Sequence, residues 1–414
     1  MSRKINTIDL FAGCGGLMDG FEQSGCFRTL ACVEWEKAPC DNLAKRLKEK
    51  WQYSNADDMV LRFDIQRTEE LFHGWNDDDY GTSNGMDVLI KKAGNVDVII
   101  GGPPCQAYSI AGRIRDENGM RDDYRNYLFE SYIRVVKHYK PKAFVFENVP
   151  GILSAKPGGF PIIEQIKKEF NDAGYAVIQD FHKAVINFTE YGVPQRRSRI
   201  IILGLSIEEY GENADTLLTQ FYENILPTYK CKLRTVKDAI KDLPALYPLQ
   251  YETKIEGKKC SHSPGSSTVS NHFPRYHSKR DIELFRLLCK DIEDGRNQYI
   301  STDALKRLYE ETTGHKSSVH KYYVLRWNEP SNLIPAHLYK DGLRHIHPDS
   351  SQARSITVRE AARLQTFPDD YVFIGSQMEQ YKMIGNAVPP KMSKIIAQSL
   401  YQLLFKEEKK DADS

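Results

Sequence analysis

Short apolar runs that stop at a glycine or an acidic residue recur through the first 205 residues of this chain. The clearest, Val98–Ile100, is rich in β-branched residues and stops at Gly101-Gly102-Pro103-Pro104. Runs of this length and composition are typical of buried strands, and the glycines and prolines predict a sharp exit from the strand. Segments of helical length separate the runs, so the sequence predicts a doubly wound α/β sheet.

Candidate strands and helices alternate along this first region. We expect strands at 6–11, 28–34, 60–63, 98–100, 143–146, 176–186 and 200–205, and helices at 17–24, 36–50 and 127–139. Residues 66–95 are polar and predict only a short helix and a surface loop. After Leu205 the alternation stops, and two expected helices, 279–292 and 302–312, lie among loops. An amphipathic helix at 389–405 precedes a charged tail, which predicts disorder.

The formal net charge of +1 hides an uneven distribution. Between Lys230 and Asp349 there are 21 lysines and arginines against 15 aspartates and glutamates, together with eight of the eleven histidines. A basic segment in a slightly acidic chain indicates contact with a polyanion, although solvated surface charge is an alternative. No apolar run approaches the roughly 18 residues of a membrane span. The N-terminus has no signal-peptide cleavage site and the eight cysteines form no CxxC pair, so we expect a cytoplasmic protein.

A glycine-rich turn follows the first expected strand. Residues 12–16 read Ala-Gly-Cys-Gly-Gly, between a strand and a helix, which lets backbone N–H groups approach a ligand closely. The second strand ends at Glu34, where a carboxylate can accept hydrogen bonds from ribose hydroxyls. Trp35 could stack on adenine or simply pack. Dinucleotide-binding and methyl-donor folds share such a turn.

Cys105 directly follows the Gly-Gly-Pro-Pro exit. A residue just beyond a parallel strand lies at the sheet edge where α/β enzymes bind ligands. The cysteine is therefore a candidate nucleophile, and a buried structural thiol is the alternative. The segment Arg113–Asn126 is charged and rich in turn residues, which predicts a loop.

Together these segments resemble the cytosine-5 DNA methyltransferase family. The motifs that match it, in the family's order, are DLFAGCGGL (9–17), VEW (33–35), DI (64–65), GGPPCQAYS (101–109), ENV (147–149), QRRSR (195–199), RSITVREAARLQTFPD (354–369) and GNAVPP (385–390). The resemblance implies a Rossmann-like AdoMet-dependent methyltransferase domain formed by residues 1–205 plus 375–406. It also implies a smaller, mixed target-recognition domain at 206–374, and we expect a disordered tail at 407–414.

The resemblance assigns catalytic roles to four residues. Cys105 adds as a thiolate to carbon 6 of cytosine, because carbon 5 is a poor nucleophile until the ring is activated. Glu147 holds ring nitrogen 3 and the exocyclic amine. Arg199, together with Arg197, addresses the carbonyl oxygen at position 2 and orients Glu147. The base that removes the carbon 5 proton is not identified by the sequence.

The cofactor implied by the resemblance is S-adenosylmethionine. Residues expected around its methionine part are Phe11, Ala12, Gly13, Gly15, Gly16 and Leu17. Those expected at its ribose and adenine are Glu34, Trp35, Asp64 and Ile65. Asn386 and Val388 are expected to close the pocket, and Pro103 is a further expected cofactor contact. For Leu17, Ile65 and Val388, plain core packing is the alternative.

Double-stranded DNA is the implied partner, with the target base flipped out of the stack. The candidate DNA contacts are Ser109, Arg113, Arg115, Arg121 and Arg125. The basic segment between Lys230 and Asp349 falls where the family keeps its variable target-recognition region. His345-Ile346-His347 lacks the flanking ligands of a zinc site, so we expect no metal. Arg359 and Glu360 are interpreted as scaffold residues.

The hypothesis is therefore a monomeric, nucleoid-associated DNA cytosine methyltransferase of the restriction-modification type, with a possible cognate endonuclease. Three alternatives remain. A related tRNA cytosine methyltransferase would normally have a much smaller recognition region. A catalytically silent AdoMet- or DNA-binding regulator would have no chemical need for Cys105, Glu147 and Arg199 together. A nicotinamide-dependent dehydrogenase would leave the Pro-Pro-Cys-Gln and Glu-Asn-Val motifs unexplained.

Overall fold

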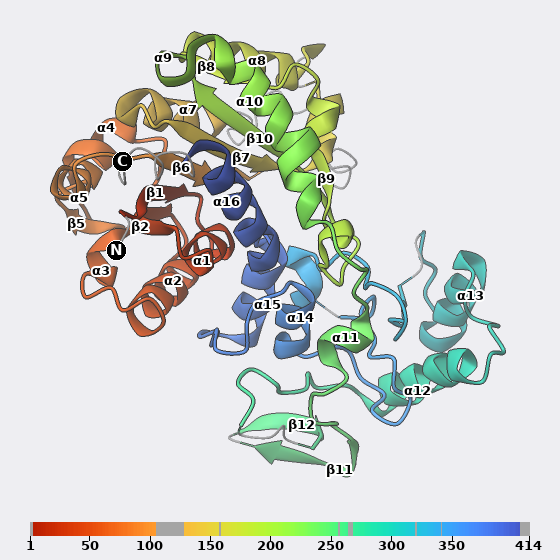
Figure 1. Cartoon of the computed structure of the whole chain (residues 1–414). Helices are drawn as coiled ribbons and strands as arrows, with labels where there is room; N and C mark the ends of the chain where they lie inside the picture. Colours follow the sequence, from red (N-terminus) through yellow and green to blue (C-terminus); the bar gives the residue numbers. More distant parts are fainter. Residues whose placement is uncertain are drawn as a thin grey trace. The chain divides into compact units, whose positions relative to one another are not determined.

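The computed structural model describes residues 3–104, 128–156, 159–255, 257–263, 268–318, 321–340 and 342–405. The chain forms two compact units (Figure 1). Unit 1 comprises Met1–Tyr191, Arg197–Lys232 and Ala387–Ser414. Unit 2 comprises Gly192–Arg196 and Leu233–Asn386.

A mixed sheet of eight strands forms the centre of the described part of unit 1. Its strands are β1 (Ile5–Leu10), β2 (Phe27–Glu34), β3 (Val60–Arg62), β6 (Val98–Gly101), β7 (Ala143–Asn148), β8 (Tyr175–Val177), β9 (Val185–Asn187) and β10 (Ser198–Ser206). Their order is β3-β2-β1-β6-β7-β10-β8, and β9 pairs with β10. The first five strands in this order are parallel, whereas β10 runs antiparallel to β7. Chain progression reverses between β1 and β6, which is where such sheets bind ligands.

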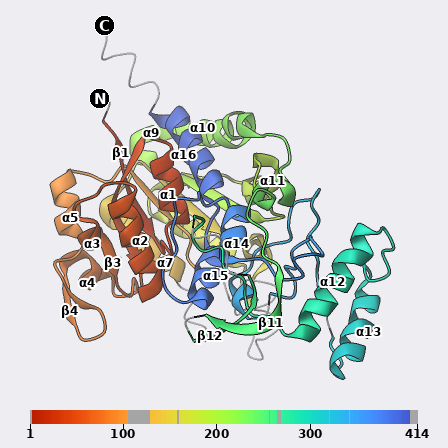
Figure 2. The same cartoon turned by 90° about the horizontal axis from the view of Figure 1, so that it is seen from below.

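Helices cover both faces of this sheet, as expected for strands as fully buried as β1 and β7 (Figure 1). The longer ones are α1 (Gly16–Gln23), α2 (Lys37–Glu49), α7 (Leu128–Tyr139), α8 (Ile162–Asp172) and α16 (Pro390–Leu404). Helix α16 lies beside α1, although the two are far apart in sequence (Figure 2). A Cβ added at Gly20 of α1 would lie 2.3 Å from the Cβ of Ser393 and 2.5 Å from the Pro390 carbonyl oxygen. The absence of a side chain at Gly20 therefore lets the two helices pack closely.

The predicted strands and helices of this region are confirmed with two differences, and the structure adds helix α8, which was not predicted. Residues 66–95, predicted as a short helix and loop, contain two helices, α4 (Thr68–His73) and α5 (Met86–Ala93), and a hairpin of β4 (Trp75–Asp77) and β5 (Gly81–Ser83). Strands of three residues are too short to show a hydrophobic period. The ring of Trp75 stacks on Phe63 at 4.0 Å, a contact with the strand region that no local pattern reveals.

The second difference concerns the predicted strand at 176–186, which is two short strands, β8 and β9, separated by a 3-10 turn at Phe181–Ala184. The side chain of Asp180 accepts a hydrogen bond from the backbone N–H of His182 and so caps this turn. A local cap therefore interrupts an apolar stretch that resembles one strand.

The bounds of the units also differ from those of the predicted domains. Residues 206–232 belong to unit 1 because α10 (Ala214–Gln220) and the turn after it pack on the sheet. The hydroxyl of Tyr222 donates to the Ile201 carbonyl at 2.8 Å and accepts from the Leu203 N–H at 2.9 Å. In the other direction, α15 (Gln377–Asn386) belongs to unit 2, where it packs on the turn Ala336–Tyr339.

Unit 2 contains a β-hairpin and a group of helices. Its elements are α11 (Val236–Ile240), β11 (Pro248–Ile255), β12 (Lys258–His262), α12 (Lys279–Glu293), α13 (Thr302–Thr313), α14 (Val358–Leu364) and α15. Helices α12 and α13, which the sequence predicted, share an apolar core that includes Phe285, Leu288 and Leu305. The hairpin was not anticipated, since part of β12 lies where a loop was expected.

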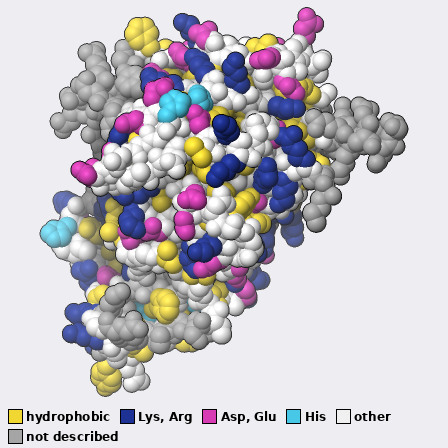
Figure 3. Space-filling model, turned by 90° about the vertical axis from the view of Figure 1, so that its left-hand side faces the viewer, with side chains coloured by type: hydrophobic (Ala, Val, Ile, Leu, Met, Phe, Trp, Pro, Cys, Tyr) yellow, Lys and Arg dark blue, Asp and Glu magenta, His cyan; other side chains and the backbone are white. Residues whose placement is uncertain are grey.

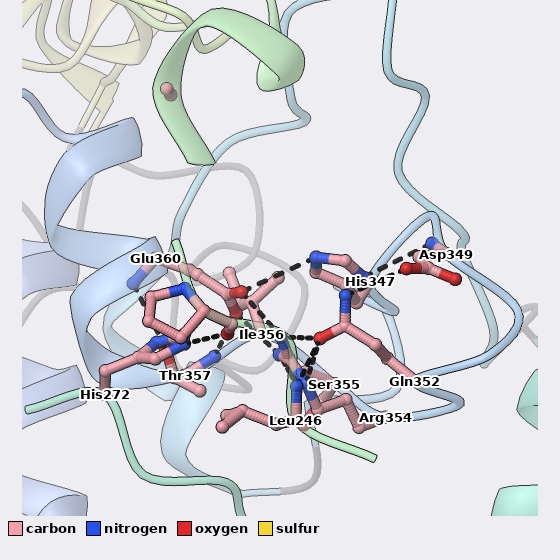
Figure 4. A network of polar contacts seen from close by, with 12 residues as sticks. Leu246, His272, His347, Asp349, Gln352, Arg354, Ser355, Ile356, Thr357 and Glu360 are labelled. Carbon is pink, nitrogen blue, oxygen red and sulfur yellow. Dashed lines mark hydrogen bonds and ion pairs between the residues drawn. The ribbon is translucent and has the colours of Figure 1, made fainter. Parts of the chain in front are cut away.

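A polar network forms the second core of unit 2 (Figure 4). Arg354 and Glu360, each 1% exposed, form two hydrogen bonds of 2.7 Å. Glu360 also accepts from the backbone N–H of Thr357 as part of a capping box that begins α14. Gln352 accepts from Arg354 and from the Leu246 N–H. A buried ion pair is tolerated only when its remaining donors and acceptors are satisfied, and this network meets that condition.

Five of the histidines in the basic segment lie buried in unit 2 and bind backbone groups: His262, His272, His277, His345 and His347. The His347 Nδ1 accepts from the Asp349 N–H, so its other nitrogen carries the proton and the ring is neutral. Burial lowers the pKa of His262 to about 4 and the pKa values of His277, His345 and His347 to about 3. These histidines therefore act as neutral scaffold groups and add no charge to the segment.

On the surface of unit 1, basic and acidic side chains form ion pairs with neighbours close in sequence. On α2, Lys37 lies 2.6 Å from Asp41, and Lys45 pairs with Glu49 one turn further on. Such exposed pairs contribute little to stability. The face drawn in Figure 3 likewise shows basic and acidic side chains interspersed. None of the described helices is long and apolar enough to cross a membrane.

Unit 2 should lose stability between pH 6.5 and pH 4.5. Each buried imidazole is neutral when folded, whereas in the unfolded chain it regains a pKa of about 6.5. The contribution of each imidazole to the free energy of unfolding is complete above pH 6.5. It decreases as the pH falls below that value, by about 2 kcal/mol per histidine at pH 5. Thermal melts followed by circular dichroism should show this slope. His345→Gln should reduce the slope, and the exposed control His182→Gln should not. A melting temperature of unit 2 that stays constant from pH 7 to pH 5 would contradict the prediction.

Candidate active site

The carboxyl ends of β1, β2, β6 and β7 meet at the switch point of the sheet, and most of the predicted site residues follow these ends. After β1 the chain turns through Phe11, Gly13 and Gly15, which all have positive φ angles of 57°, 54° and 80°. The turn is held by hydrogen bonds from the Ala12 N–H to the Val33 carbonyl and from the Gly15 N–H to the Ala12 carbonyl. This conformation costs glycine little, which explains two of the glycines in the motif.

Gly16 has a different role, because it faces the C-terminal segment of unit 1. A Cβ at this position would lie 2.3 Å from the Val388 carbonyl oxygen. Val388 and Leu17 are both buried, at 6% and 5% exposure. The first glycine turn and the last sequence motif therefore meet in unit 1. Asn386 ends α15 in unit 2 and is exposed.

Glu34 connects the ends of β1 and β2. One carboxylate oxygen accepts from the Gly13 N–H at 2.8 Å, and the other accepts from the N–H groups of Trp35 and Glu36. Burial raises the pKa of Glu34, and these N–H groups offset part of the increase. Trp35 is 49% exposed. A carboxylate, an exposed indole and a glycine turn at one sheet edge suit a ligand with an adenosine group.

Beyond β3, Asp64 accepts from the Gln66 N–H at 3.0 Å, and Ile65 is buried. Asp9 was missed as a supporting residue. It is 1% exposed, and its carboxyl accepts from the Met18 N–H at the start of α1. Burial raises the pKa of Asp9 well above its usual value. The sequence did carry a signal for this role, because Asp9 is an acidic residue within an otherwise mostly apolar strand.

Glu147 and Arg199 form an ion pair at the ends of β7 and β10. The Arg199 Nε lies 2.9 Å from a Glu147 carboxylate oxygen, and both side chains are only slightly exposed, at 13% and 12%. The antiparallel register, which pairs Ile201 with Glu147, brings them together. Arg199 also donates to the Ser198 carbonyl. The two residues that sequence reasoning paired are thus in direct contact.

Gly102 places the exit of β6 against this pair. A Cβ at Gly102 would lie 2.6 Å from the second carboxylate oxygen of Glu147, so only glycine fits without displacement. The side chain of Asn148 donates to the Pro103 carbonyl at 3.4 Å and accepts from the Val149 N–H. The chain leaving β6 is therefore held against Glu147 three residues before Cys105. The described residues do not include Cys105, Ser109, Arg113, Arg115, Arg121 and Arg125.

Arg197 occupies a different environment from Arg199. It is 3% exposed, and one guanidinium nitrogen donates to the Ala387 carbonyl at 2.9 Å. Burial, together with the neighbouring Arg199, lowers the pKa of Arg197. This contact joins the start of β10 to the C-terminal segment. Among the described residues no group of three or more histidine, cysteine, aspartate or glutamate side chains could hold a metal ion.

Comparison with known proteins identifies the family. Residues 5–402 match the model of the C-5 cytosine-specific DNA methylases. The chain is 35% identical to the type II methyltransferase M.Bpa9945I of Bacillus paralicheniformis, over 96% of this chain and 98% of that protein. It is 30% identical to M.DdeI of Desulfomicrobium norvegicum, over 96% and 88%.

A solved structure of a putative prophage-encoded DNA modification methyltransferase from E. coli shares the fold. Its TM-score is 0.60 at 23% identity, and the match covers 97% of this chain and 99% of that one. The chain belongs to the C-5 cytosine-specific DNA methylase family, whose members transfer a methyl group from S-adenosylmethionine to carbon 5 of cytosine in DNA.

Proposed function

We propose that this enzyme methylates one cytosine within a specific duplex sequence, with Cys105 as the nucleophile and Glu147 and Arg199 as the groups that bind the base. The observation that carries the assignment is the Glu147–Arg199 ion pair, which lies against Gly102 at the strand exit that leads to Cys105. In this proposal the thiol of Cys105, the carboxylate of Glu147 and the guanidinium of Arg199 together activate the cytosine ring.

The chemistry begins with the Cys105 thiolate, which forms a sulfur–carbon bond at carbon 6 and pushes an electron pair into the ring. Glu147, hydrogen-bonded to ring nitrogen 3 and the exocyclic amine, stabilises the charge that develops there. Arg199 keeps the Glu147 carboxyl in orientation and donates to the carbonyl oxygen at position 2. S-adenosylmethionine, when bound, supplies an electrophilic methyl group to the activated carbon 5. A base then removes the carbon 5 proton, and the electron pair of that bond expels Cys105 as a thiolate, which restores the aromatic ring.

The cofactor is proposed to lie at the ends of β1, β2 and β3. Glu34 would hold the ribose hydroxyls, since its carboxylate already lies at the glycine turn. Trp35 would stack on one adenine face, and Asp64 would bind the adenine amine, with Ile65 on the other face. The turn from Phe11 to Leu17, Pro103, Val388 and Asn386 would surround the remainder.

The DNA contacts and the biological setting are also proposals. Base flipping requires contacts near the pocket, for which Ser109, Arg113, Arg115, Arg121 and Arg125 are candidates. Unit 2 would read the target sequence, and Arg197 would support the pocket wall through Ala387. The named type II relatives favour a restriction-modification system with a cognate endonuclease of the same specificity. We propose a monomer acting on nucleoid DNA in the cytoplasm.

Cys105→Ser should reduce methyl transfer to duplex DNA by about 10³-fold or more, because a hydroxyl is a far weaker nucleophile than a thiolate. Binding of S-adenosylmethionine, followed by calorimetry, should remain within about twofold, since the thiol is not part of that site. Duplex DNA with 5-fluorocytosine at the target should trap the wild-type enzyme covalently, because fluorine blocks the final elimination. Full turnover in the serine variant would exclude Cys105 as the nucleophile.

Glu147→Gln should lower the single-turnover rate by about 10²- to 10⁴-fold, because the amide is no longer charged or able to share a proton with the ring. The rate of methyl transfer under enzyme excess is the measurement. Glu223→Gln is the matched control, since it removes an exposed ion pair with Lys183 elsewhere in unit 1. An unchanged rate in the Glu147 variant would remove this residue from the mechanism.

Trp35→Ala should weaken S-adenosylmethionine binding by about tenfold through loss of one stacking surface. The fold should tolerate the change because this side chain is 49% exposed. Isothermal titration calorimetry reports the dissociation constant, and Phe160→Ala serves as a control at another exposed aromatic, 78% exposed. Equal affinities in the two variants would contradict stacking at Trp35.

A further inference from the structure

The segment that carries the QRRSR motif is divided between the units. Gly192–Arg196 belongs to unit 2, whereas Arg197 and the residues after it belong to unit 1. Within unit 2, Gln195 forms a parallel bridge with Ser331. The Arg196 N–H donates to the Ser331 carbonyl at 2.8 Å, and the Ser331 N–H donates to the Pro194 carbonyl at 3.0 Å. The segment is thus attached to unit 2 by its backbone.

The side chain of Gln195 strengthens this attachment. It is fully buried, and both the oxygen and the nitrogen of its amide form hydrogen bonds. The oxygen accepts from the Ile334 N–H at 2.8 Å, and the nitrogen donates to the Gln365 side-chain oxygen at 2.7 Å and to the Leu364 carbonyl at 3.3 Å. The Gln195 amide thus faces one hydrogen-bond donor and two acceptors. A glutamate at this position would place a carboxylate oxygen against the two acceptor oxygens, so the neutral amide fits and the carboxylate does not. Glutamine is specified here by its partners.

Gln365 extends the contact to another place where the chain passes between the units, Asn386–Ala387. This residue is also fully buried, and its amide nitrogen donates to the Ile384 carbonyl on α15 at 2.6 Å. Three residues later the chain enters unit 1 at Ala387. There the Ala387 carbonyl accepts from Arg197, two residues after Gln195. Both connections are therefore anchored, one by Gln195 and the other by Gln365.

Only a short segment of chain separates Gln195 from Arg199. Residues 197 and 198 alone intervene between Arg196 and Arg199, and β10 begins at Ser198. Within unit 1, Arg199 pairs with Ile186 of β9, and the Arg197 carbonyl accepts from the Phe188 N–H. Because adjacent Cα atoms are about 3.8 Å apart, few backbone dihedrals between Gln195 and Arg199 are available to take up a displacement of Gln195. We therefore expect such a displacement to change the position of Arg199, which contacts Glu147.

We propose that Gln195 is a positioning residue through which unit 2 sets the geometry of the Glu147–Arg199 pair. Gln195 contacts neither the base nor the cofactor in this proposal, and acts through the short segment to Arg199. The inference rests on the proposed roles of Glu147 and Arg199. Its consequence is that loss of the Gln195–Gln365 contact slows catalysis while leaving both ligands bound.

The test uses Gln195→Leu, which keeps the shape of the side chain and removes its hydrogen bonds. In the full-length enzyme, dissociation constants for duplex DNA and S-adenosylmethionine should stay within about twofold, while kcat falls about 10- to 100-fold. The rate of adduct formation with 5-fluorocytosine DNA should fall by the same factor. Glu329→Gln is the matched control, because it removes the exposed ion pair with Arg196 on the same segment. Its kcat should match that of the wild type.

Gln365→Leu provides an independent variant and should give the same loss of kcat. The loss of kcat in the double variant should be smaller than the product of the two single losses, because both substitutions remove the shared Gln195–Gln365 hydrogen bond. If circular dichroism shows that Gln195→Leu is unfolded, Gln365→Leu carries the test. Wild-type kcat in either folded variant, or a loss confined to KM for DNA, would overturn the proposal. Full turnover in Glu147→Gln would instead refute the proposed function on which it rests.

Discussion

Parallel pairing of β1, β6 and β7 is the constraint on which the rest of unit 1 depends. It brings three strand ends to one edge, and the reversal of chain progression between β1 and β6 leaves that edge free of a crossover. The glycine turn follows β1, Glu34 is the last residue of β2, and Glu147 is the penultimate residue of β7. Their positions therefore follow from the register of buried strands, which a local change cannot shift without moving the apolar core. The antiparallel strand β10 then adds Arg199 from the other direction.

Unit 2 is stabilised in a different way. One part is an ordinary apolar core between α12 and α13, and the other is a buried polar network around Arg354 and Glu360. Neutral histidines complete this network by binding backbone groups. Such an arrangement holds irregular loops in one conformation, because each buried donor needs a specific acceptor. That rigidity suits the role proposed for unit 2, in which side chains on loops contact DNA.

The chain passes between the two units at four places, and Arg196–Arg197 and Asn386–Ala387 are two of them. Hydrogen bonds from buried side chains secure both places, through Gln195 and Gln365 on one side and Arg197 on the other. In the proposed function, unit 2 recognises the DNA and unit 1 carries the catalytic residues. Short segments held by buried hydrogen bonds connect the two units. The QRRSR motif thus combines an anchor in unit 2 with a ligand for Glu147 in unit 1.

Much of this protein is determined by the sequence alone. Apolar runs and their glycine or acidic ends predict a doubly wound sheet and the positions of most of its strands along the chain, because burial and backbone freedom act locally. The motifs also single out Glu147 and Arg199 before their contact is visible. The place of residues 206–232 in unit 1 and the neutrality of the buried histidines depend on partners distant in sequence. The tertiary structure alone decides these features, because burial and hydrogen-bond partners, rather than residue type, set the charge of a histidine and the role of a glutamine such as Gln195.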